Sequence, residues 1–218
     1  MVTGASRGIG AAIARRLERD GIRTIRRSSE QADLSTMEGV DKALEGIDSL
    51  DILVNNAAAA PGGPIETDTP ESFDHLMAVN VRAPYFLIQR APINDGGRIV
   101  NVSSAATRMA NPAQTSFAMT KGALETMSRT LAHQLGPRGI TVNVVAPGAT
   151  KTEANENIFT PELEVAIETL TAQKRLGTAD DIADVVAFLA SDDARWVTGQ
   201  VLDASGGLFL GPPALGVQ

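Results

Sequence analysis

The 218-residue sequence contains no cysteine, which excludes disulfide bonds and thiolate metal sites. It has only two histidines, far apart in the chain, so metal-ligand spacing is absent and we predict no metal site. Positive charge is also scarce: a net charge of -7 argues against binding to nucleic acid or to an anionic membrane. No apolar run approaches the roughly 20 residues of a membrane span, and the start, M-V-T-G, does not resemble a signal peptide. These absences predict a cytoplasmic protein.

What is present predicts one domain, residues 1–218, with a sizeable core. Apolar strands alternate with amphipathic helices, the pattern of a parallel sheet covered on both faces, so we expect a doubly wound α/β fold. Ser35 to Glu38 fits a capping box, and Pro84 should bend or interrupt its helix. After a minimal first strand, strands are expected at about 22–25, 51–55, 98–103, 140–145 and 200–203, and helices at about 11–19, 35–47, 70–89, 116–135, 160–172 and 178–190.

A glycine-rich turn, G-A-S-R-G-I-G, lies between the first strand and the first helix. Glycine lets the backbone turn tightly and approach a pyrophosphate, and the helix N-terminus supplies unpaired N–H groups. By itself, such a turn is also compatible with a plain strand-to-helix connection.

A series of further motifs follows the turn in order: Asp33-Leu34, N-N-A-A at 55–58, Asn80, V-S-S at 102–104, Lys121, P-G at 147–148 and a terminal S-G-G. Together they resemble the short-chain dehydrogenase/reductase family, similar to its 3-oxoacyl-carrier-protein-reductase-like members. The match covers nearly the whole chain. It implies a Rossmann-like sheet and an NADP or NAD cofactor.

The resemblance implies a set of cofactor contacts. In the family, the glycine turn holds the pyrophosphate and ribose, an aspartate the adenine edge, and the P-G-x-x-x-T segment the nicotinamide carboxamide. One departure is Ala58, where the family has glycine and where a methyl group could crowd the ribose. The implied contacts are Gly4, Ser6, Arg7, Gly8, Ile9, Gly10, Asp33, Leu34, Asn56, Ala57, Ala58, Lys121, Pro147, Gly148 and Thr152.

The residues after the second strand indicate which cofactor is used. An acidic side chain there accepts a 2'-hydroxyl, whereas a guanidinium pairs with a 2'-phosphate. This chain has Arg26 and Arg27, beside Arg7 in the turn, which favours NADP over NAD. The alternative is that these arginines are solvated surface residues.

The resemblance also implies the catalytic positions. Asn80 is the supporting asparagine, Ser104 the substrate serine and Lys121 the lysine, with Phe117 where the family has its proton-donating tyrosine. Phe117 and Lys121 are spaced i, i+4, so they share one helical face. General acid catalysis contributes about 10²- to 10⁴-fold, so reduction by the usual route should be severely slowed.

No other side chain replaces the phenol in the sequence. Tyr85 is the only tyrosine and lacks a lysine four residues on, so we interpret it as core or interface packing. His75 and His133 are interpreted as surface side chains, and Trp196 as structural.

The chain also departs from the family in length. Between Arg27 and Asp33 the family has a helix and a third strand, whereas this chain has a few residues. An edge of the sheet should therefore be shortened or lost and the adenine pocket should be more open. Residues 211–218 are expected to form a loose or partner-packed tail.

Three functions remain open. The first is an NADP-dependent oxidoreductase on a small carbonyl or alcohol, impaired by Phe117. The second is a repurposed scaffold for a redox-neutral cyclisation, dehydration or isomerisation, with Ser104 and Lys121 as polarising groups. The third is a catalytically silent binding subunit. The resemblance implies a homo-oligomer, a dimer or tetramer, and the variable segments 105–114 and 151–175 should select the substrate.

Overall fold

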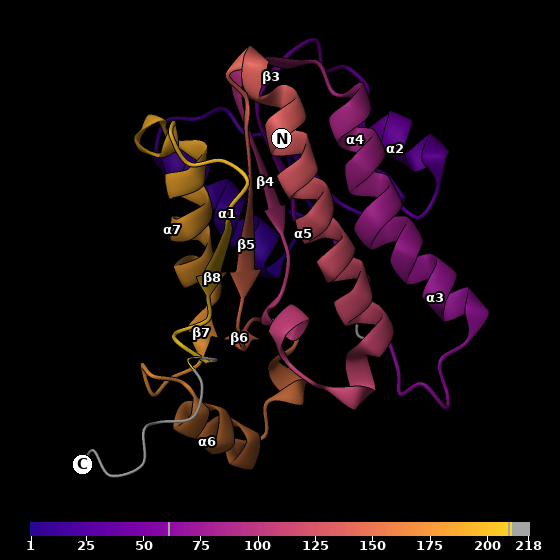
Figure 1. The fold of residues 1–218 in the computed structure, drawn as a ribbon, viewed down its shortest axis with the longest axis vertical. Helices are drawn as coiled ribbons and strands as arrows, with labels where there is room; N and C mark the ends of the chain where they lie inside the picture. The colour runs from indigo at the N-terminus through magenta and orange to yellow at the C-terminus, as the bar shows by residue number, and fades with distance from the viewer. Residues whose placement is uncertain (61, 209, 211–218) are drawn as a thin grey trace.

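The structure, a computed structural model, describes residues 1–60, 62–208 and 210, so the predicted tail lies outside the described residues. A six-stranded parallel sheet has the order β2-β1-β3-β4-β5-β8, with helices on both faces (Figure 1). This confirms the predicted Rossmann-like, doubly wound α/β fold. The strands are β1 (Val2–Thr3), β2 (Arg26–Arg27), β3 (Leu50–Asn55), β4 (Ile93–Val102), β5 (Thr141–Pro147) and β8 (Val201–Ala204).

Two hydrophobic cores lie on opposite faces of the sheet. On one face, α1 (Gly8–Arg19) and α7 (Ala179–Ala190) cover valines of the central strands, including Val54 and Val100. On the other, α2 (Met37–Leu44), α4 (Ala83–Arg90) and α5 (Thr115–Leu135) cover Leu53 and Ile99. Successive strand residues thus enter different cores, as the period of two in a strand requires. Strand β5 is buried along its whole length, which explains its uniformly apolar sequence.

The shortened edge of the sheet is present as predicted. Strand β2 has two residues and is the outermost strand in the described part of the chain. The predicted strand at 22–25 was wrong, because β1 offers only Val2 and Thr3 as partners and these pair with Arg26 and Arg27. Turns follow β2 until α2 begins.

The N-terminus of α2 also differs from the expected capping box. Thr36, not Ser35, is the N-cap, and its side chain accepts a hydrogen bond from the Gly39 amide at 3.0 Å. Serine and threonine are both favoured N-cap residues, so the sequence alone did not decide which of these two neighbours begins the helix.

The long helix expected at 70–89 is interrupted near its proline, as predicted. It consists of α3 (Pro70–Met77), a π-helical turn (Ala78–Arg82) and α4, in which Pro84 is the second residue. Proline cannot donate the usual backbone hydrogen bond, and the widened turn absorbs that loss.

The remaining elements lie beyond the carboxyl ends of the strands. A small parallel pair, β6 (Thr150–Lys151) and β7 (Gly177–Thr178), flanks the helix α6 (Pro161–Leu170) at the lower end of the molecule (Figure 1). In an open parallel sheet this is the end at which ligands bind. No helix in the described residues is both long and apolar enough to cross a membrane.

Candidate active site and cofactor cleft

A cavity of about 460 Å³ opens at the carboxyl ends of β1 and β3. Its volume lies in the usual range for a small-molecule site. It is lined by thirteen of the predicted cofactor residues: Gly4, Ser6, Arg7, Gly8, Ile9, Gly10, Arg27, Asp33, Leu34, Asn56, Ala57, Ala58 and Thr152. Four others, Arg26, Lys121, Pro147 and Gly148, are not among its lining residues.

The glycine turn is built for close backbone approach. Gly4 and Gly8 have φ angles of +63° and +57°, a region that other residues rarely adopt. A Cβ atom at Gly10 would lie 2.2 Å from the Gly4 carbonyl oxygen, so only glycine fits there. The turn therefore presents backbone, without side chains, at the N-terminus of α1, which suits a pyrophosphate.

A brace that the sequence did not reveal holds this turn in place. The Thr3 hydroxyl accepts hydrogen bonds from the amides of Asn56 and Ala57 at 3.1 and 3.0 Å. The Asn56 side chain donates to the carbonyl oxygens of Thr3 and Gly4 at 2.9 and 3.3 Å. The glycine turn and the loop after β3 are thus one rigid unit. The amide side chain of Asn56 serves this brace.

The two arginines after β2 differ in their surroundings. Arg26 forms a two-pronged ion pair with Glu18, with contacts of 3.0 and 2.6 Å, and points to the α1 side. Arg27 donates to the carbonyl oxygens of Ala43 and Glu45 at the end of α2, and it lines the cavity. Arg26 is therefore paired away from the cavity. Arg27 lines the cavity, but its Nε and Nη2 atoms are already bonded to the end of α2.

Arg7 and two serines lie with Arg27 in the lining of the cavity. Arg7 is exposed at the N-cap of α1 and forms no ion pair with the residues that the structure describes. Ser28 and Ser29, which the sequence analysis did not single out, also line the cavity. A guanidinium and two hydroxyls are suitable donors for a phosphate.

Asp33 lies on another wall of the cavity, before α2. Hydrogen bonds from Ser35 lower the pKa of the Asp33 carboxyl, and the charge of nearby His75 adds to the effect. One of these bonds is from the Ser35 amide, at 2.9 Å. The side chain is therefore a fixed anion that can accept a hydrogen bond from an amine.

The predicted catalytic residues Asn80, Ser104, Phe117 and Lys121 are not among the residues that line the cavity. Ser104 caps a 3-10 helix (Ala105–Arg108) by accepting from the Ala106 amide at 3.1 Å, which leaves its hydroxyl hydrogen free to donate. The preceding serine, Ser103, is buried and donates to Glu125 at 2.7 Å. Of the two serines, Ser104 is therefore the one that can serve a substrate.

Lys121 is buried and donates to the Val102 carbonyl oxygen at 2.9 Å. Burial lowers its pKa to about 8, while Glu125 opposes that shift. Its Nζ atom lies 5.6 Å from the centre of the Phe117 ring, as expected for an i, i+4 pair on α5. An ammonium group thus faces an aromatic ring that carries no hydroxyl.

Asn80 connects the cofactor cleft with α5. Its amide side chain accepts from the Ala59 amide at 2.8 Å and donates to the Ala59 carbonyl at 3.0 Å. It also donates to the Thr120 hydroxyl at 3.0 Å. Ala59 lines the cavity and Thr120 precedes Lys121, so Asn80 positions the two parts of the site relative to each other.

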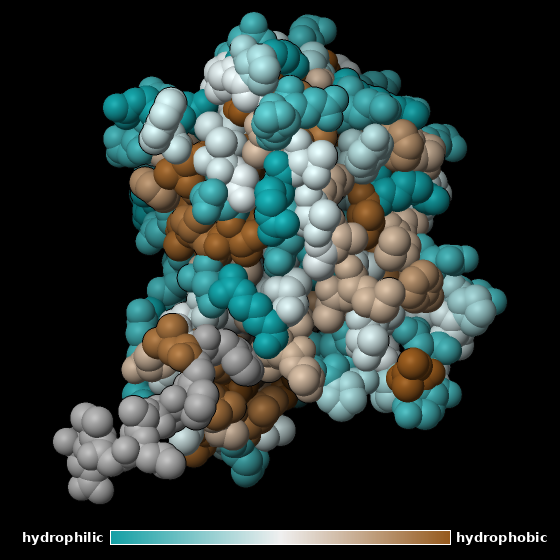
Figure 2. Space-filling view, viewed as in Figure 1, coloured by the Kyte–Doolittle hydropathy of each residue, from teal (hydrophilic) through white to brown (hydrophobic). Residues whose placement is uncertain are grey.

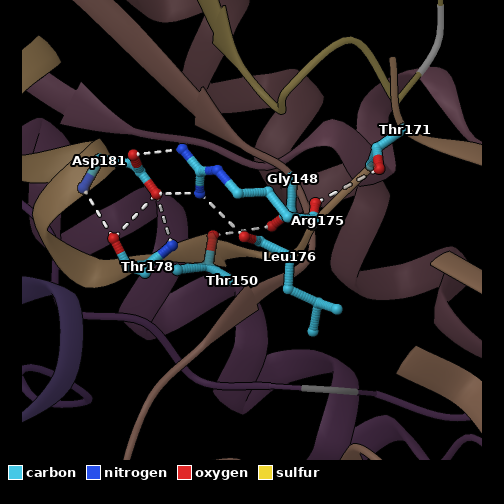
Figure 3. Close-up of polar contacts among 7 residues, drawn as sticks. All are labelled: Gly148, Thr150, Thr171, Arg175, Leu176, Thr178 and Asp181. Carbon is cyan, nitrogen blue, oxygen red and sulfur yellow. Dashed lines mark hydrogen bonds and ion pairs between the residues drawn. The ribbon is translucent and has the colours of Figure 1, made fainter. Parts of the chain in front are cut away.

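Figure 3 shows polar contacts around Gly148 and Thr150 and among residues of the segment 171–181. Arg175 pairs with both carboxylate oxygens of Asp181 at 2.7 and 2.8 Å, and Thr178 with Asp181 forms the capping box of α7. The Gly177 amide donates to the Ala149 carbonyl oxygen at 2.9 Å, and this contact and the pairing of the two strands hold β7 beside β6, just before Thr152. Thr152 in turn lies against the glycine turn: its Cβ would be 3.6 Å from a Cβ at Gly8.

The segment between β6 and β7 carries α6, which has no buried residue. Its apolar side chains Val165 and Leu170 are 62% and 65% exposed, and Ile158 before it is 65% exposed. Figure 2 shows the corresponding hydrophobic surface at the lower end of the molecule. The segment that follows Thr152 thus exposes several apolar side chains.

Several lining residues were not anticipated. Ser28, Ser29, Ala32, Ala59, His75, Val79, Ala154 and Asn155 line the cavity together with the predicted residues. No glycine pattern or charge run marks them, and only their position beside motif residues could have suggested them. Among the described residues, no group of three or more potential metal ligands occurs.

The parallel sheet carries a glycine turn at its switch point, and the Asn56 side chain braces that turn. Together with the Asp33 carboxylate in the cavity, these features are those of a dinucleotide-binding protein. The comparisons agree. A family model described as enoyl-(acyl carrier protein) reductase matches residues 28–209. With the relatives below, it shows that the chain belongs to the short-chain dehydrogenase/reductase family.

Two curated relatives span the chain. An uncharacterized oxidoreductase of Methylorubrum extorquens is 40% identical over 238 residues, covering 95% of this chain and 96% of the relative. The 3-oxoacyl-acyl-carrier-protein reductase FabG of Haemophilus influenzae is 34% identical, with coverages of 96% and 97%.

Solved structures also resemble this chain over nearly its whole length. The angucycline C-6 ketoreductase LanV with bound NADP has a TM-score of 0.87 at 42% identity, with 96% of this chain and 95% of that chain covered. A blue fluorescent protein from a metagenomic library, in complex with NADPH, has a TM-score of 0.85 at 37% identity, with coverages of 95% and 96%.

Proposed function

We propose that this protein is an NADP(H)-dependent oxidoreductase of a carbonyl or alcohol substrate, with its rate lowered by Phe117. The observation that carries the proposal is the cavity itself, where the glycine turn, Arg7, Arg27 and Asp33 meet. LanV and the metagenomic protein, which were solved with NADP and NADPH, support the choice of cofactor.

The residues present fit this cofactor. The close approach at Gly4 and Gly10 leaves backbone N–H groups for the pyrophosphate, and Arg7, Arg27, Ser28 and Ser29 offer donors to a 2'-phosphate. Asp33 would accept from the adenine amine, and Thr152 would hold the carboxamide. When bound, NADPH supplies a hydride.

The chain's own residues then act on the substrate oxygen. Ser104 can donate its hydroxyl hydrogen to a carbonyl and polarise it. Lys121, whose ammonium faces the Phe117 ring, adds positive charge to the site. This charge would stabilise the alkoxide that forms as the carbonyl is reduced. Because Phe117 has no proton to give, the alkoxide must take its proton from water. The reaction is therefore expected to be slow.

For the substrate, we propose a small apolar ketone or the corresponding alcohol. Support comes from the exposed apolar side chains around α6, beside Thr152. LanV is named as an angucycline ketoreductase, so polycyclic aromatic ketones belong in a substrate panel together with simple ketones and 3-oxoacyl thioesters.

The first test restores the phenol. Phe117→Tyr adds a hydroxyl to the ring that Lys121 faces, and we expect NADPH oxidation with a ketone panel to rise about 10²- to 10⁴-fold. Tyr85→Phe is the matched control, since Tyr85 lies on α4 and is 46% exposed, away from Ser104. Absence of NADPH oxidation by Phe117→Tyr on the whole panel would end the oxidoreductase proposal.

The second candidate is a repurposed or silent member of the family. The specific observation that favours it is an intact Ser104 and Lys121 around a ring that cannot donate a proton. A redox-neutral reaction would use both as polarising groups, whereas a binding subunit would use neither. Fluorescence titration with NADPH, together with a product assay, separates both from the oxidoreductase, because tight NADPH binding with hydride transfer to product excludes both.

We further propose a homo-oligomer, a dimer or tetramer, and a cytoplasmic location. The oligomer is supported by large apolar side chains exposed on α4, on α7 and before β8, namely Tyr85, Phe188 and Trp196.

A further inference from the structure

His75, interpreted from the sequence as a surface side chain, lies at the cofactor cavity. It is an exposed residue in the last turn of α3, and it lines the cavity together with Val79, one helical turn on. Asp33 and Leu34, from the turns that precede α2, line the same cavity. His75 also lies close enough to Asp33 to lower the pKa of its carboxyl, so the two side chains are near each other at the predicted adenine end of the cleft.

The spacing across this slot is held by a hydrogen bond. Arg82, on the same helical face as His75 and Val79, donates to the Ser35 carbonyl oxygen. The Ser35 amide in turn donates to the Asp33 carboxylate at 2.9 Å. The helix bearing His75 and the turn bearing Asp33 are thus connected through Ser35 by two hydrogen bonds.

The slot has a distinct chemistry at each of its walls. Asp33 supplies an acceptor, Leu34 and Val79 supply apolar surface, and His75 supplies a planar aromatic ring. Arg7 and Arg27 line the same cavity and are the donors proposed above for the phosphate. A flat heterocycle with an exocyclic amine matches these groups. Its amine can donate to the Asp33 carboxylate, and its ring can stack on the imidazole and the apolar side chains.

We propose that His75 is a cofactor-recognition residue that forms the outer wall of the adenine slot. This inference rests on the proposed NADP function and adds a residue to it. The shortened edge at β2 makes the role necessary, because it leaves fewer elements to enclose the base. His75 adds affinity for the adenine half of the cofactor and none for the nicotinamide half.

The test compares two variants and a matched control by titration calorimetry. His75→Ala removes the ring, and His75→Phe keeps a planar ring without ring nitrogens. His133→Ala is the control, since His133 is the other histidine, is exposed on α5 and does not line this cavity. The probes are NADPH, adenosine 2',5'-bisphosphate and reduced nicotinamide mononucleotide, which lacks adenine.

We expect His75→Ala to weaken NADPH and adenosine 2',5'-bisphosphate about tenfold, in the range that base stacking on an aromatic ring contributes. His75→Phe should regain most of that affinity, and His133→Ala should bind as the wild type does. Reduced nicotinamide mononucleotide should bind all four proteins alike. Circular dichroism confirms that each variant is folded.

Two results would overturn the inference alone: unchanged adenosine 2',5'-bisphosphate affinity in His75→Ala, or an equal loss for reduced nicotinamide mononucleotide. A wild-type protein that binds neither NADPH nor adenosine 2',5'-bisphosphate would overturn the proposed function as well, so the two failures are distinguishable.

Discussion

At the scale of single residues, Phe117 and Lys121 decide what this site can do. The lysine keeps its place, with Nζ bonded to Val102 and close to the ring, although the ring has no hydroxyl. A buried ammonium is unfavourable unless something uses its charge, because burial favours the neutral form. The retained lysine is therefore best understood through the charge it can offer to a bound oxygen.

The lowered pKa of Lys121 predicts a pH-dependent stability. In the unfolded chain the lysine keeps its proton to about pH 10.5, whereas burial lowers its pKa in the folded chain to about 8. Between these values the unfolded state binds more protons, so the contribution of Lys121 to stability rises with pH. Urea unfolding of wild type and Lys121→Met at about pH 7.5 and 9.5 measures it.

Relative to Lys121→Met, the wild-type free energy of unfolding should gain about 2 kcal/mol between those two pH values. Other titrating groups are common to both proteins and cancel in the difference. A difference that stays flat with pH would show that the folded-state pKa of this lysine is not lowered.

At the scale of elements, the start of α1 depends on the absence of a side chain. Gly10→Ala would bring a Cβ 2.2 Å from the Gly4 carbonyl oxygen and 2.4 Å from the Asn56 side-chain nitrogen. The brace between the turn and the loop after β3 must then move. We expect a loss of about 1 to 3 kcal/mol in unfolding free energy, as for other overpacked sites, and loss of NADPH binding.

Gly122→Ala provides the contrast. Gly122 is also helical, in α5, but a Cβ there meets nothing within 4 Å. This variant should gain roughly 0.5 to 1 kcal/mol from helix propensity and bind NADPH unchanged. Urea unfolding and NADPH fluorescence measure both variants, and an equal response of the two would refute the steric argument.

At the scale of the whole molecule, large apolar side chains remain exposed on several elements besides α6. Tyr85 on α4, Phe188 on α7 and Trp196 before β8 are 46%, 44% and 96% exposed. We expect these surfaces to be covered in an assembly, so light scattering should give the mass of a dimer or tetramer of the 22.8 kDa chain. A monomer mass across micromolar concentrations would contradict this prediction.

The sequence determined the fold class, the order of the elements and the positions of the motifs. Apolar strands such as β5, the proline at 84 and the glycines of the turn each impose a local conformation that needs no distant partner to be recognised. The i, i+4 spacing of Phe117 and Lys121 likewise follows from the helix alone. Family membership followed from the order of these motifs.

Only the tertiary structure decided which of these residues meet. Arg26 pairs with Glu18 and Arg27 with the end of α2, although the two arginines are adjacent in the chain. The pairing register of β2, the Thr3–Asn56 brace and the position of His75 near Asp33 depend on contacts between residues far apart in sequence. Such contacts leave no local pattern in the sequence. Two residues that are adjacent in the chain look equally able to make them, and only the folded sheet decides which of the two meets the distant partner.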